Sequence, residues 1–266
     1  MTSADPVEAF ILASRAELLR AGLERVECQG SIYFRGGKAG APVVVLIHGV
    51  NDQAGTWAPV VGVLAGRFRL IVPDLAGHGE SAPSEGPLPL PMIVGKLAAV
   101  IGEETADPVT LVGNSMGGWV SLLYTLAHPE RVARLVLEDA SGIAWIISIP
   151  LFPSTREQAI VALHAVNGPH AETPDWAIDA MLARTKNAPM TRVTETISNL
   201  LDARLGELHV PTTLIWGADD GLLPVVYAEA LVRKIEGASL HVIEGAAHIP
   251  HRQQPEKFLA CLNTTF

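Results

Sequence analysis

Residues 111–124 read LVGNSMGGWVSLLY, an apolar run that passes through a group of small residues into a helical pattern. Within this stretch, Gly113–Gly117 fits G-x-S-x-G between a strand and a helix, the context that this motif requires. The glycines at both ends allow a turn that is too tight for larger side chains. Such a turn would hold Ser115 in a strained, exposed conformation above the carboxyl ends of the strands, where open α/β sheets bind ligands. The stretch predicts a nucleophilic Ser115, and a Gly/Ser turn without chemistry is the alternative.

Apolar runs on both sides of this stretch predict a parallel sheet. Six short segments are almost continuously apolar, as strands buried on both faces are: residues 43–49, 69–74, 109–114, 134–139, 212–217 and 240–245. Helical patterns lie near residues 56–66, 92–105, 116–127, 225–236 and 255–263. The alternation predicts a doubly wound, mostly parallel α/β sheet. Residues 25–35 predict two more strands that lead into it, which brings the sheet to about eight strands.

One long segment departs from the alternation. Residues 141–208 separate two predicted strands and have a helical pattern without a clear strand. The segment is too long for an ordinary connection inside a compact domain. We therefore expect a helical cap over 141–208, inserted into a core domain that consists of residues 1–140 and 209–266.

Composition and charge exclude several classes of partner. The chain has 266 residues, 48% hydrophobic and 18% charged, which suits one globular domain with an insertion. Its net charge of −9, without a run of Lys or Arg, argues against nucleic acid and anionic membrane surfaces as partners. The two cysteines, Cys28 and Cys261, lie far apart and lack the spacing of metal ligands. We expect a small-molecule substrate and no metal site.

The N-terminus predicts a helix over residues 5–22. Asp5 is placed as its N-cap, Pro6 lies in the first turn, and Glu8 would complete a capping box. The segment carries acidic residues early and has no continuous apolar region before a cleavage site, so it does not resemble an export signal and favours a cytoplasmic protein. No run of about 18 apolar residues occurs, so we expect no transmembrane segment.

A serine nucleophile needs a histidine base and a carboxylate that orients the histidine. Of nine histidines, His248 is best placed, because it follows the last predicted strand and a small-residue turn. His251 competes with it, although it stands where the next helix should begin. For the acid, Asp219 and Asp220 follow one strand and Asp139 ends the preceding strand. All three remain candidates, and each could equally be an ordinary turn residue.

Several motifs taken together resemble the α/β-hydrolase superfamily, and the resemblance covers nearly all of residues 25–263. The matching segments are His48–Gly49, Pro73–Ser81, Gly113–Gly118, Trp216–Asp220 and Gly245–Phe258. In that family the triad acid usually lies three residues after the glycine of W-G-x-x-D, which selects Asp220 over Asp219. The triad histidine usually lies seven residues before the proline of H-x₆-P-E-x-F, which selects His248 over His251. The resemblance thus implies the fold and a Ser115, Asp220 and His248 triad.

The resemblance also implies an oxyanion hole and a reaction. Two backbone N–H groups form the oxyanion hole in that family, and carried over they belong to Val50 and Met116. Haloalkane dehalogenases and epoxide hydrolases of the superfamily use an aspartate where Ser115 stands, so their chemistries are disfavoured. The reaction implied is acyl transfer to water through an acyl-enzyme, without a metal or organic cofactor. His48 and His78 belong to family motifs in which they are mostly structural.

The substrate is predicted from the cap. Residues 142–152, GIAWIISIPLF, would open the cap with apolar side chains, among them Trp145 and Ile146. They could pack between cap and core, or form a wall for an apolar acyl group. Ile249, next to His248, is a further candidate contact. We therefore expect a serine carboxylesterase for uncharged, apolar acyl groups.

Hydrolysis of a C–C bond is the alternative. The nucleophile segment also resembles that of meta-cleavage-product hydrolases, which cleave ring-fission products. Arg184 resembles the cap arginine that binds the substrate carboxylate in those enzymes, although it could be a solvated charge on an amphipathic helix. Two features depart from their pattern: Ile249 stands where tryptophan is usual, and residues 48–57, HGVNDQAGTW, lack the Gly-Pro-Gly run. A non-catalytic ligand-binding protein on the same scaffold is a third hypothesis, and the oligomeric state is left open.

Overall fold

Short runs of aliphatic residues form one eight-stranded sheet, in the order β1-β2-β4-β3-β6-β7-β9-β10. The computed structural model describes residues 5–184 and 188–266, without the side chain of Arg184. The strands are β1 (Leu23–Cys28), β2 (Ser31–Gly37), β3 (Val43–Ile47), β4 (Arg69–Pro73), β6 (Val109–Asn114), β7 (Val132–Glu138), β9 (Thr212–Gly217) and β10 (Ser239–Ile243). β1, β2 and β4 pair antiparallel, and the remaining pairs are parallel. The predicted doubly wound, mostly parallel sheet is confirmed.

Burial on both faces explains why the strands could be recognised. Every residue of β3 and of β6 is buried, so these strands are apolar throughout rather than alternating. The predicted ranges 109–114 and 212–217 coincide with β6 and β9, and the predicted 240–245 lies one to two residues from β10. The antiparallel β1 and β2 are the two strands expected from residues 25–35.

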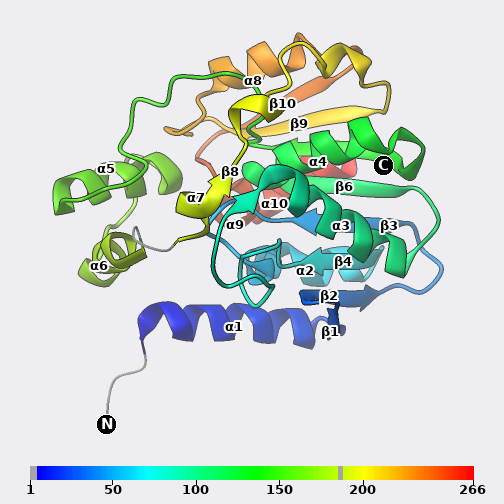
Figure 1. The fold of residues 1–266 in the computed structure, drawn as a ribbon, viewed down its shortest axis with the longest axis horizontal. Helices are drawn as coiled ribbons and strands as arrows, with labels where there is room; N and C mark the ends of the chain where they lie inside the picture. Colours follow the sequence, from blue (N-terminus) through cyan, green and yellow to red (C-terminus); the bar gives the residue numbers. More distant parts are fainter. Residues whose placement is uncertain (1–4, 185–187) are drawn as a thin grey trace.

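Helices cover both faces of the sheet (Figure 1). One core cluster includes α3 (Leu90–Glu104), α4 (Met116–Ala127) and α8 (Val225–Val232), and the opposite cluster includes α1 (Pro6–Arg20), α2 (Ala58–Ala65) and α10 (Pro255–Asn263). α1 begins as expected: Asp5 caps it by accepting the Val7 N–H, and Pro6 is its first residue. Among the helices that the structure describes, none has the length and apolarity that a bilayer span requires.

The site of the chemistry follows from the strand order. β3 lies between β4 and β6, so the chain runs to one side of β3 first and then crosses to the other side. The loops after β3 and β6 therefore leave in opposite directions and open a crevice between them at the carboxyl ends of the strands. His48 and Gly49 follow β3, and Ser115 follows β6.

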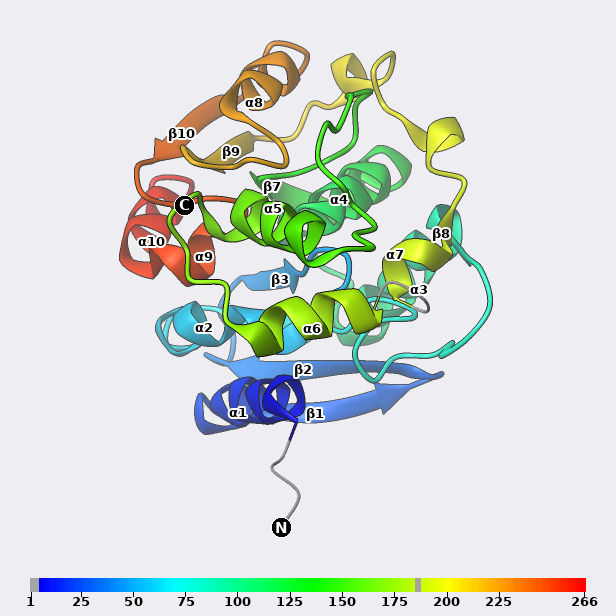
Figure 2. The ribbon, with the colours of Figure 1, turned by 90° about the vertical axis from the view of Figure 1, so that its left-hand side faces the viewer.

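Residues 141–208 connect β7 to β9, and their last part, with Leu201, Leu205 and Leu208, packs in the core against the sheet. They form α5 (Arg156–Asn167), α6 (Asp175–Arg184) and the short α7 (Pro189–Arg192), and in Figure 2 α5 and α6 lie in front of the strands. We expected no strand here, but β8 (Val193–Thr194) pairs in parallel with β5 (Leu88–Pro89), which belongs to a Pro-rich segment at residues 81–91. Two residues are too few to produce a recognisable apolar pattern, which is why the sequence did not indicate this strand.

Candidate active site

Ser115 stands at a strained turn between β6 and α4. Its φ is 53° and its ψ is −120°, a conformation that non-glycine residues rarely adopt. The flanking glycines make room for this turn, because a Cβ on Gly113 would lie 2.5 Å from the Gly117 carbonyl oxygen, and one on Gly117 would lie 2.4 Å from that of Ile47. The Ser115 N–H donates to the Glu138 carbonyl at 2.9 Å and fixes the turn to β7.

A histidine contacts this serine, and a carboxylate contacts the histidine. The distance from His248 Nε2 to Ser115 Oγ is 2.9 Å, and the distance from His248 Nδ1 to Asp220 Oδ2 is 2.8 Å. With Nδ1–H donating to the carboxylate, Nε2 is left to accept from the serine hydroxyl; this tautomer is assigned from the partners. Asp220 Oδ1 also accepts the backbone N–H groups of Leu222 and Leu223 at 2.8 and 2.9 Å. The structure thus brings together the three side chains predicted to form the triad.

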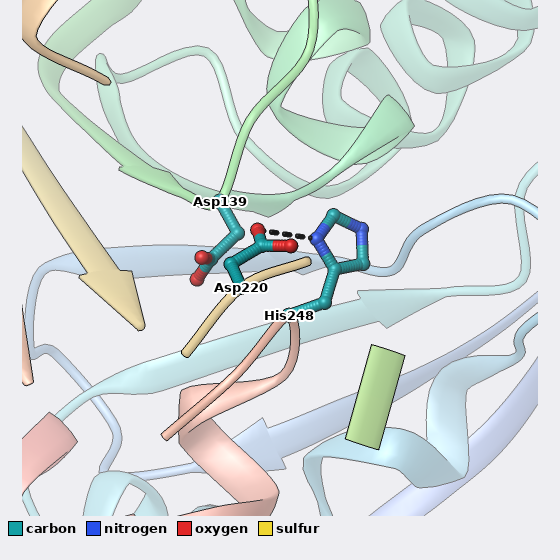
Figure 3. A group of neighbouring side chains, drawn as sticks. All are labelled: Asp139, Asp220 and His248. Carbon is teal, nitrogen blue, oxygen red and sulfur yellow. Dashed lines mark hydrogen bonds and ion pairs between the residues drawn. The ribbon is translucent and has the colours of Figure 1, made fainter. Parts of the chain in front are cut away.

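The competing residues are placed elsewhere. Asp219 is exposed, while its backbone N–H donates to the Ala246 carbonyl. His251 lies in the core: its Nδ1 is 2.7 Å from Glu138 Oε2, and its Nε2 is 3.0 Å from Thr56 Oγ1. Asp139, the third candidate acid, is fully buried next to Asp220 (Figure 3).

Asp139, Asp220 and His248 form a compact group that could be considered as a metal site. One ligand atom from each lies within 4.8 Å of the other two. However, Asp220 Oδ2 and His248 Nδ1 are hydrogen-bonded to each other, so a cation would have to replace that bond. Burial raises the pKa of Asp139 well above its ordinary value, and the proximity of Asp220 and of Glu138 raises it further. A carboxyl group that keeps its proton is a poor metal ligand.

The two predicted oxyanion donors lie close to the serine. Met116 follows Ser115 and is the first residue of α4, so its N–H belongs to the electropositive end of a 12-residue helix. Val50 follows Gly49, on which a Cβ would lie only 3.1 Å from the Ser115 Cβ. Neither N–H donates to another backbone carbonyl in the part of the chain that the structure describes. Both donors therefore remain available to a ligand.

Some residues that position this site were not predicted from the sequence. Asn114 Nδ2 donates to the His248 carbonyl at 2.9 Å, and the His248 N–H donates to the Val166 carbonyl at 3.1 Å. The Gly221 N–H donates to the Ala165 carbonyl at 3.0 Å. The loops that carry His248 and Asp220 are therefore both tied to the last residues of α5. Asn114 belongs to the quoted motif, but its contact joins residues 134 positions apart, which no local pattern reveals.

A cavity of about 1320 Å³ opens at Ser115 and His248. Its walls are mainly apolar and come from four helices: α1 with Val7, Phe10 and Ile11; α5 with Ala162, Leu163 and Val166; α6 with Trp176, Ala177, Ala180 and Met181; and α7 with Pro189 and Met190. Ile249, one of the candidate substrate contacts, lines the cavity. Ile149, Leu151 and Phe152, which precede α5, also line the cavity, as do the loop after β3 and residues 77–84.

Two predicted substrate contacts are not part of this cavity. Trp145 packs edge-on against Tyr227, with the ring centroids 5.4 Å apart, and Ile146 is 90% exposed. Neither contributes to the described lining, so the predicted apolar wall begins three residues later, at Ile149. Arg184 is the last residue of α6, and its side chain lies outside the described residues.

Four of the described charged residues line the cavity, Asp52, Glu80, Arg192 and Arg252. Arg192 donates to the Pro83 and Gly86 carbonyls at 2.7 and 2.8 Å. The Arg252 guanidinium lies 4.9 Å from the ring centroid of Phe10. The guanidinium groups of Arg192 and Arg252 thus both already have partners within the protein.

His48 and His78, the two histidines of the family motifs, contact backbone groups of the loops near the site. His48 Nδ1 lies 2.7 Å from the Gly49 carbonyl, and His48 Nε2 accepts the Leu75 N–H at 3.0 Å. His78 Nδ1 lies 3.0 Å from the Ala76 carbonyl. Burial, and to a smaller extent the proximity of His48, lowers the pKa of His78 to about 3. His78 therefore stays neutral at physiological pH.

The chain is similar in sequence and in fold to known proteins. Residues 44–260 match the family described as "Alpha/beta hydrolase family". The chain is 28% identical to the 2-hydroxy-6-oxononadienedioate/2-hydroxy-6-oxononatrienedioate hydrolase of Paraburkholderia xenovorans over 95% of each chain. It is 26% identical to human monoacylglycerol lipase ABHD6, with 87% of this chain and 79% of the lipase covered. A crystal structure of a bacterial membrane phospholipase A superposes with a TM-score of 0.80 at 24% identity, covering 98% and 92% of the two chains.

Proposed function

Because the chain belongs to the α/β-hydrolase family, we propose that it hydrolyses carboxylic esters of uncharged, apolar acyl groups through an acyl-enzyme on Ser115. The observation that carries this proposal is the hydrogen-bonded series from Ser115 through His248 to Asp220, which opens into a large apolar cavity. A serine hydroxyl becomes a nucleophile when a positioned base removes its proton during attack.

The proposed reaction has two halves. In the first, Ser115 Oγ attacks the ester carbonyl carbon while His248 Nε2 takes the hydroxyl proton and then passes it to the departing alcohol. In the second, His248 activates a water molecule that attacks the acyl-enzyme, and the proton returns to Ser115 as the carboxylic acid leaves. Asp220 stabilises the imidazolium that forms in each half and holds the ring in the required tautomer.

The carbonyl oxygen becomes negatively charged in both halves. The N–H groups of Val50 and Met116 are the proposed donors to this oxyanion. Fixed donors of this kind are worth about 10²–10³-fold in rate each. The N-terminus of α4 adds a favourable dipole at the same place.

We propose that residues 141–208 act as a cap that forms the acyl site. Support comes from α5 and α6, whose apolar side chains face the cavity together with Ile249. Apolar pockets with few polar groups favour uncharged, apolar ligands. Trp145 and Ile146 are not included in this site, because they do not line the cavity.

C–C bond hydrolysis is the second candidate, and the relative from Paraburkholderia xenovorans favours it by its name. A ring-fission product carries a carboxylate, so such a reaction needs a cation that faces Ser115. Among the described cavity residues, Arg192 donates to backbone carbonyls and Arg252 stacks on Phe10. These contacts favour a neutral substrate, and Arg184 is the residue to test for the alternative.

Covalent labelling tests the proposed nucleophile. A fluorophosphonate probe should form one adduct, located on Ser115 by peptide mass analysis, and p-nitrophenyl butyrate should be hydrolysed. Ser115→Ala should lose the label and at least about 10³-fold in turnover. Ser84→Ala is the matched control, because Ser84 is an exposed serine in the same cavity and should leave both results unchanged. An adduct on another residue, or an active Ser115→Ala variant, would refute the proposal.

A substrate comparison separates the two candidate reactions. An esterase should hydrolyse p-nitrophenyl butyrate far faster than it cleaves a ring-fission dienoate, and Arg184→Ala should keep butyrate hydrolysis within a few-fold of wild type. Efficient dienoate cleavage that is lost in Arg184→Ala would replace ester hydrolysis by C–C hydrolysis.

A further inference from the structure

The buried carboxyl groups of Glu138, Asp139 and Asp220 lie near one another, and they accept different numbers of hydrogen bonds. Asp220 accepts three hydrogen bonds, from the backbone N–H groups of Leu222 and Leu223 and from His248 Nδ1. Glu138 accepts two from His251, one from its backbone N–H and one at Nδ1, both at 2.7 Å. Asp139 accepts one. A buried carboxylate with few donors is the one that holds a proton most readily.

One of the two carboxyl oxygens of Asp139 has a hydrogen-bond partner and the other has none among the described residues. Its Oδ1 accepts the Gly217 N–H at 3.0 Å, whereas its buried Oδ2 has no partner among the residues that the structure describes. Figure 3 shows its carboxyl group next to that of Asp220, which lies between Asp139 and His248. Two ionised carboxylates in contact would repel each other, while a protonated one can donate to the other.

From this geometry we propose that Asp139 is a neutral carboxylic acid whose Oδ2–H donates to Asp220, and that it positions the Asp220 carboxylate for His248. The inference rests on the proposed function, because it assigns a role through the triad. Asp220 then accepts bonds from both of its side-chain neighbours as well as from the backbone, which limits its rotation. His248 faces one negative charge instead of two. Asp139 does not contact the substrate and is a positioning residue.

The charged and titratable surroundings agree with a proton on Asp139. It is fully buried, and the titratable groups near it are Asp220 from the loop after β9, His248 from the loop after β10 and Glu138, the last residue of β7. Glu138 is itself paired with His251 of α9 (Pro250–Gln253). Burial is the largest cause that raises the pKa of Asp139, followed by the proximity of Asp220. The Gly217 N–H acts in the opposite direction.

Asp139→Asn tests whether the group is neutral. The asparagine oxygen can accept the Gly217 N–H and its NH₂ can donate to Asp220, so it reproduces the protonated acid. Asparagine also tolerates the φ of 41° at this position. We expect the acidic limb of the pH dependence of phosphonate labelling and of kcat/KM to stay within about 0.3 pH unit of wild type. An ionised Asp139 would instead stabilise the imidazolium, and its loss would move the limb to lower pH by about one unit or more, which would overturn the proposal.

Asp139→Gly tests the hydrogen bond, because glycine accepts the positive φ but has no donor. We expect kcat to fall about three- to tenfold with KM unchanged, as for the loss of one hydrogen bond. A glycine variant as active as Asp139→Asn would show that the donor is dispensable and would refute the role. Thermal melting of all three proteins checks that each is folded.

Infrared spectroscopy provides a readout that does not depend on activity. The wild-type protein at pH 7 should show the C=O stretching band of a protonated carboxylic acid, and Asp139→Asn should lack it. An identical spectrum in the two proteins would refute the protonated state. If Ser115 is not labelled by the phosphonate, the proposed function fails while the infrared band still reports on Asp139, so the two failures are distinguishable.

Discussion

Asp219 and Asp220 are neighbours in the chain with opposite surroundings. Asp220 is 4% exposed and accepts three hydrogen bonds, whereas Asp219 is exposed to solvent. The strand pattern could show only that both follow β9. The family resemblance favoured Asp220, and the difference in hydrogen bonding gives a physical reason for that choice, because a carboxylate that orients a histidine must itself be held in place.

The two aspartates should respond differently to amidation. In Asp220→Asn the amide oxygen can still accept from Leu222 and Leu223, but the NH₂ then faces His248 Nδ1–H, donor against donor. The ring is driven toward the other tautomer, and kcat for p-nitrophenyl butyrate should fall about 10²–10⁴-fold. Asp219→Asn, the matched control, should stay within a few-fold. Equal losses, or a larger loss at Asp219, would contradict the assignment of Asp220.

At the scale of elements, the sequence predicted those features that depend on residues close together in the chain. β6 and β9 were predicted from apolar runs because both faces of these strands are buried. The hydrogen bonds from His248 and Gly221 to the end of α5 were not predictable, because they join segments distant in the chain. Apolarity also suggested that Trp145 would contact substrate, but apolar character does not identify the contact: Trp145 is 40% exposed and packs edge-on against Tyr227.

Helix α1 was predicted, but its place in the cavity wall was not. Ile11 lines the cavity, whereas the next residue, Leu12, is 62% exposed and does not line it. Successive helical residues point about 100° apart, which explains the difference. The N-terminal helix therefore shapes the acyl site under the proposed function.

Ile11→Trp should narrow this site for long acyl chains. We expect kcat/KM for a long-chain p-nitrophenyl ester to fall about tenfold, while the butyrate ester changes less than threefold, since a crowded pocket rejects extra methylenes by about 1–3 kcal/mol. Leu12→Trp, on the outer side of the same helix, should leave the chain-length preference unchanged. Equal effects of Ile11→Trp on short and long esters would show that the acyl chain does not reach α1.

At the scale of the whole molecule, two buried groups make stability depend on pH in opposite directions. The pKa of His78 is lowered to about 3, so below its ordinary value the unfolded chain binds a proton that the native protein does not. Its contribution to the free energy of unfolding is therefore lost as the pH falls from about 6.5 toward 3. The pKa of Asp139 is raised, so the native protein holds a proton that the unfolded chain releases above 3.8. Its contribution is lost as the pH rises above that value.

Urea denaturation between pH 4 and 8 should separate these contributions. Relative to wild type, Asp139→Asn should gain about 1.4 kcal/mol in the free energy of unfolding for each pH unit of increase until the native Asp139 ionises. His78→Asn keeps a donor for the Ala76 carbonyl, and relative to wild type its free energy of unfolding should gain a similar amount for each pH unit of decrease below about pH 6.5.

All other titrating groups are shared between each variant and the wild type, so their contributions cancel in these differences. Between about pH 4 and 6.5 the contributions of the two groups have opposite slopes in the wild type. A constant offset between Asp139→Asn and wild type would mean that Asp139 ionises normally in the folded protein, and a constant offset for His78→Asn would mean that His78 takes up its proton there as readily as in the unfolded chain.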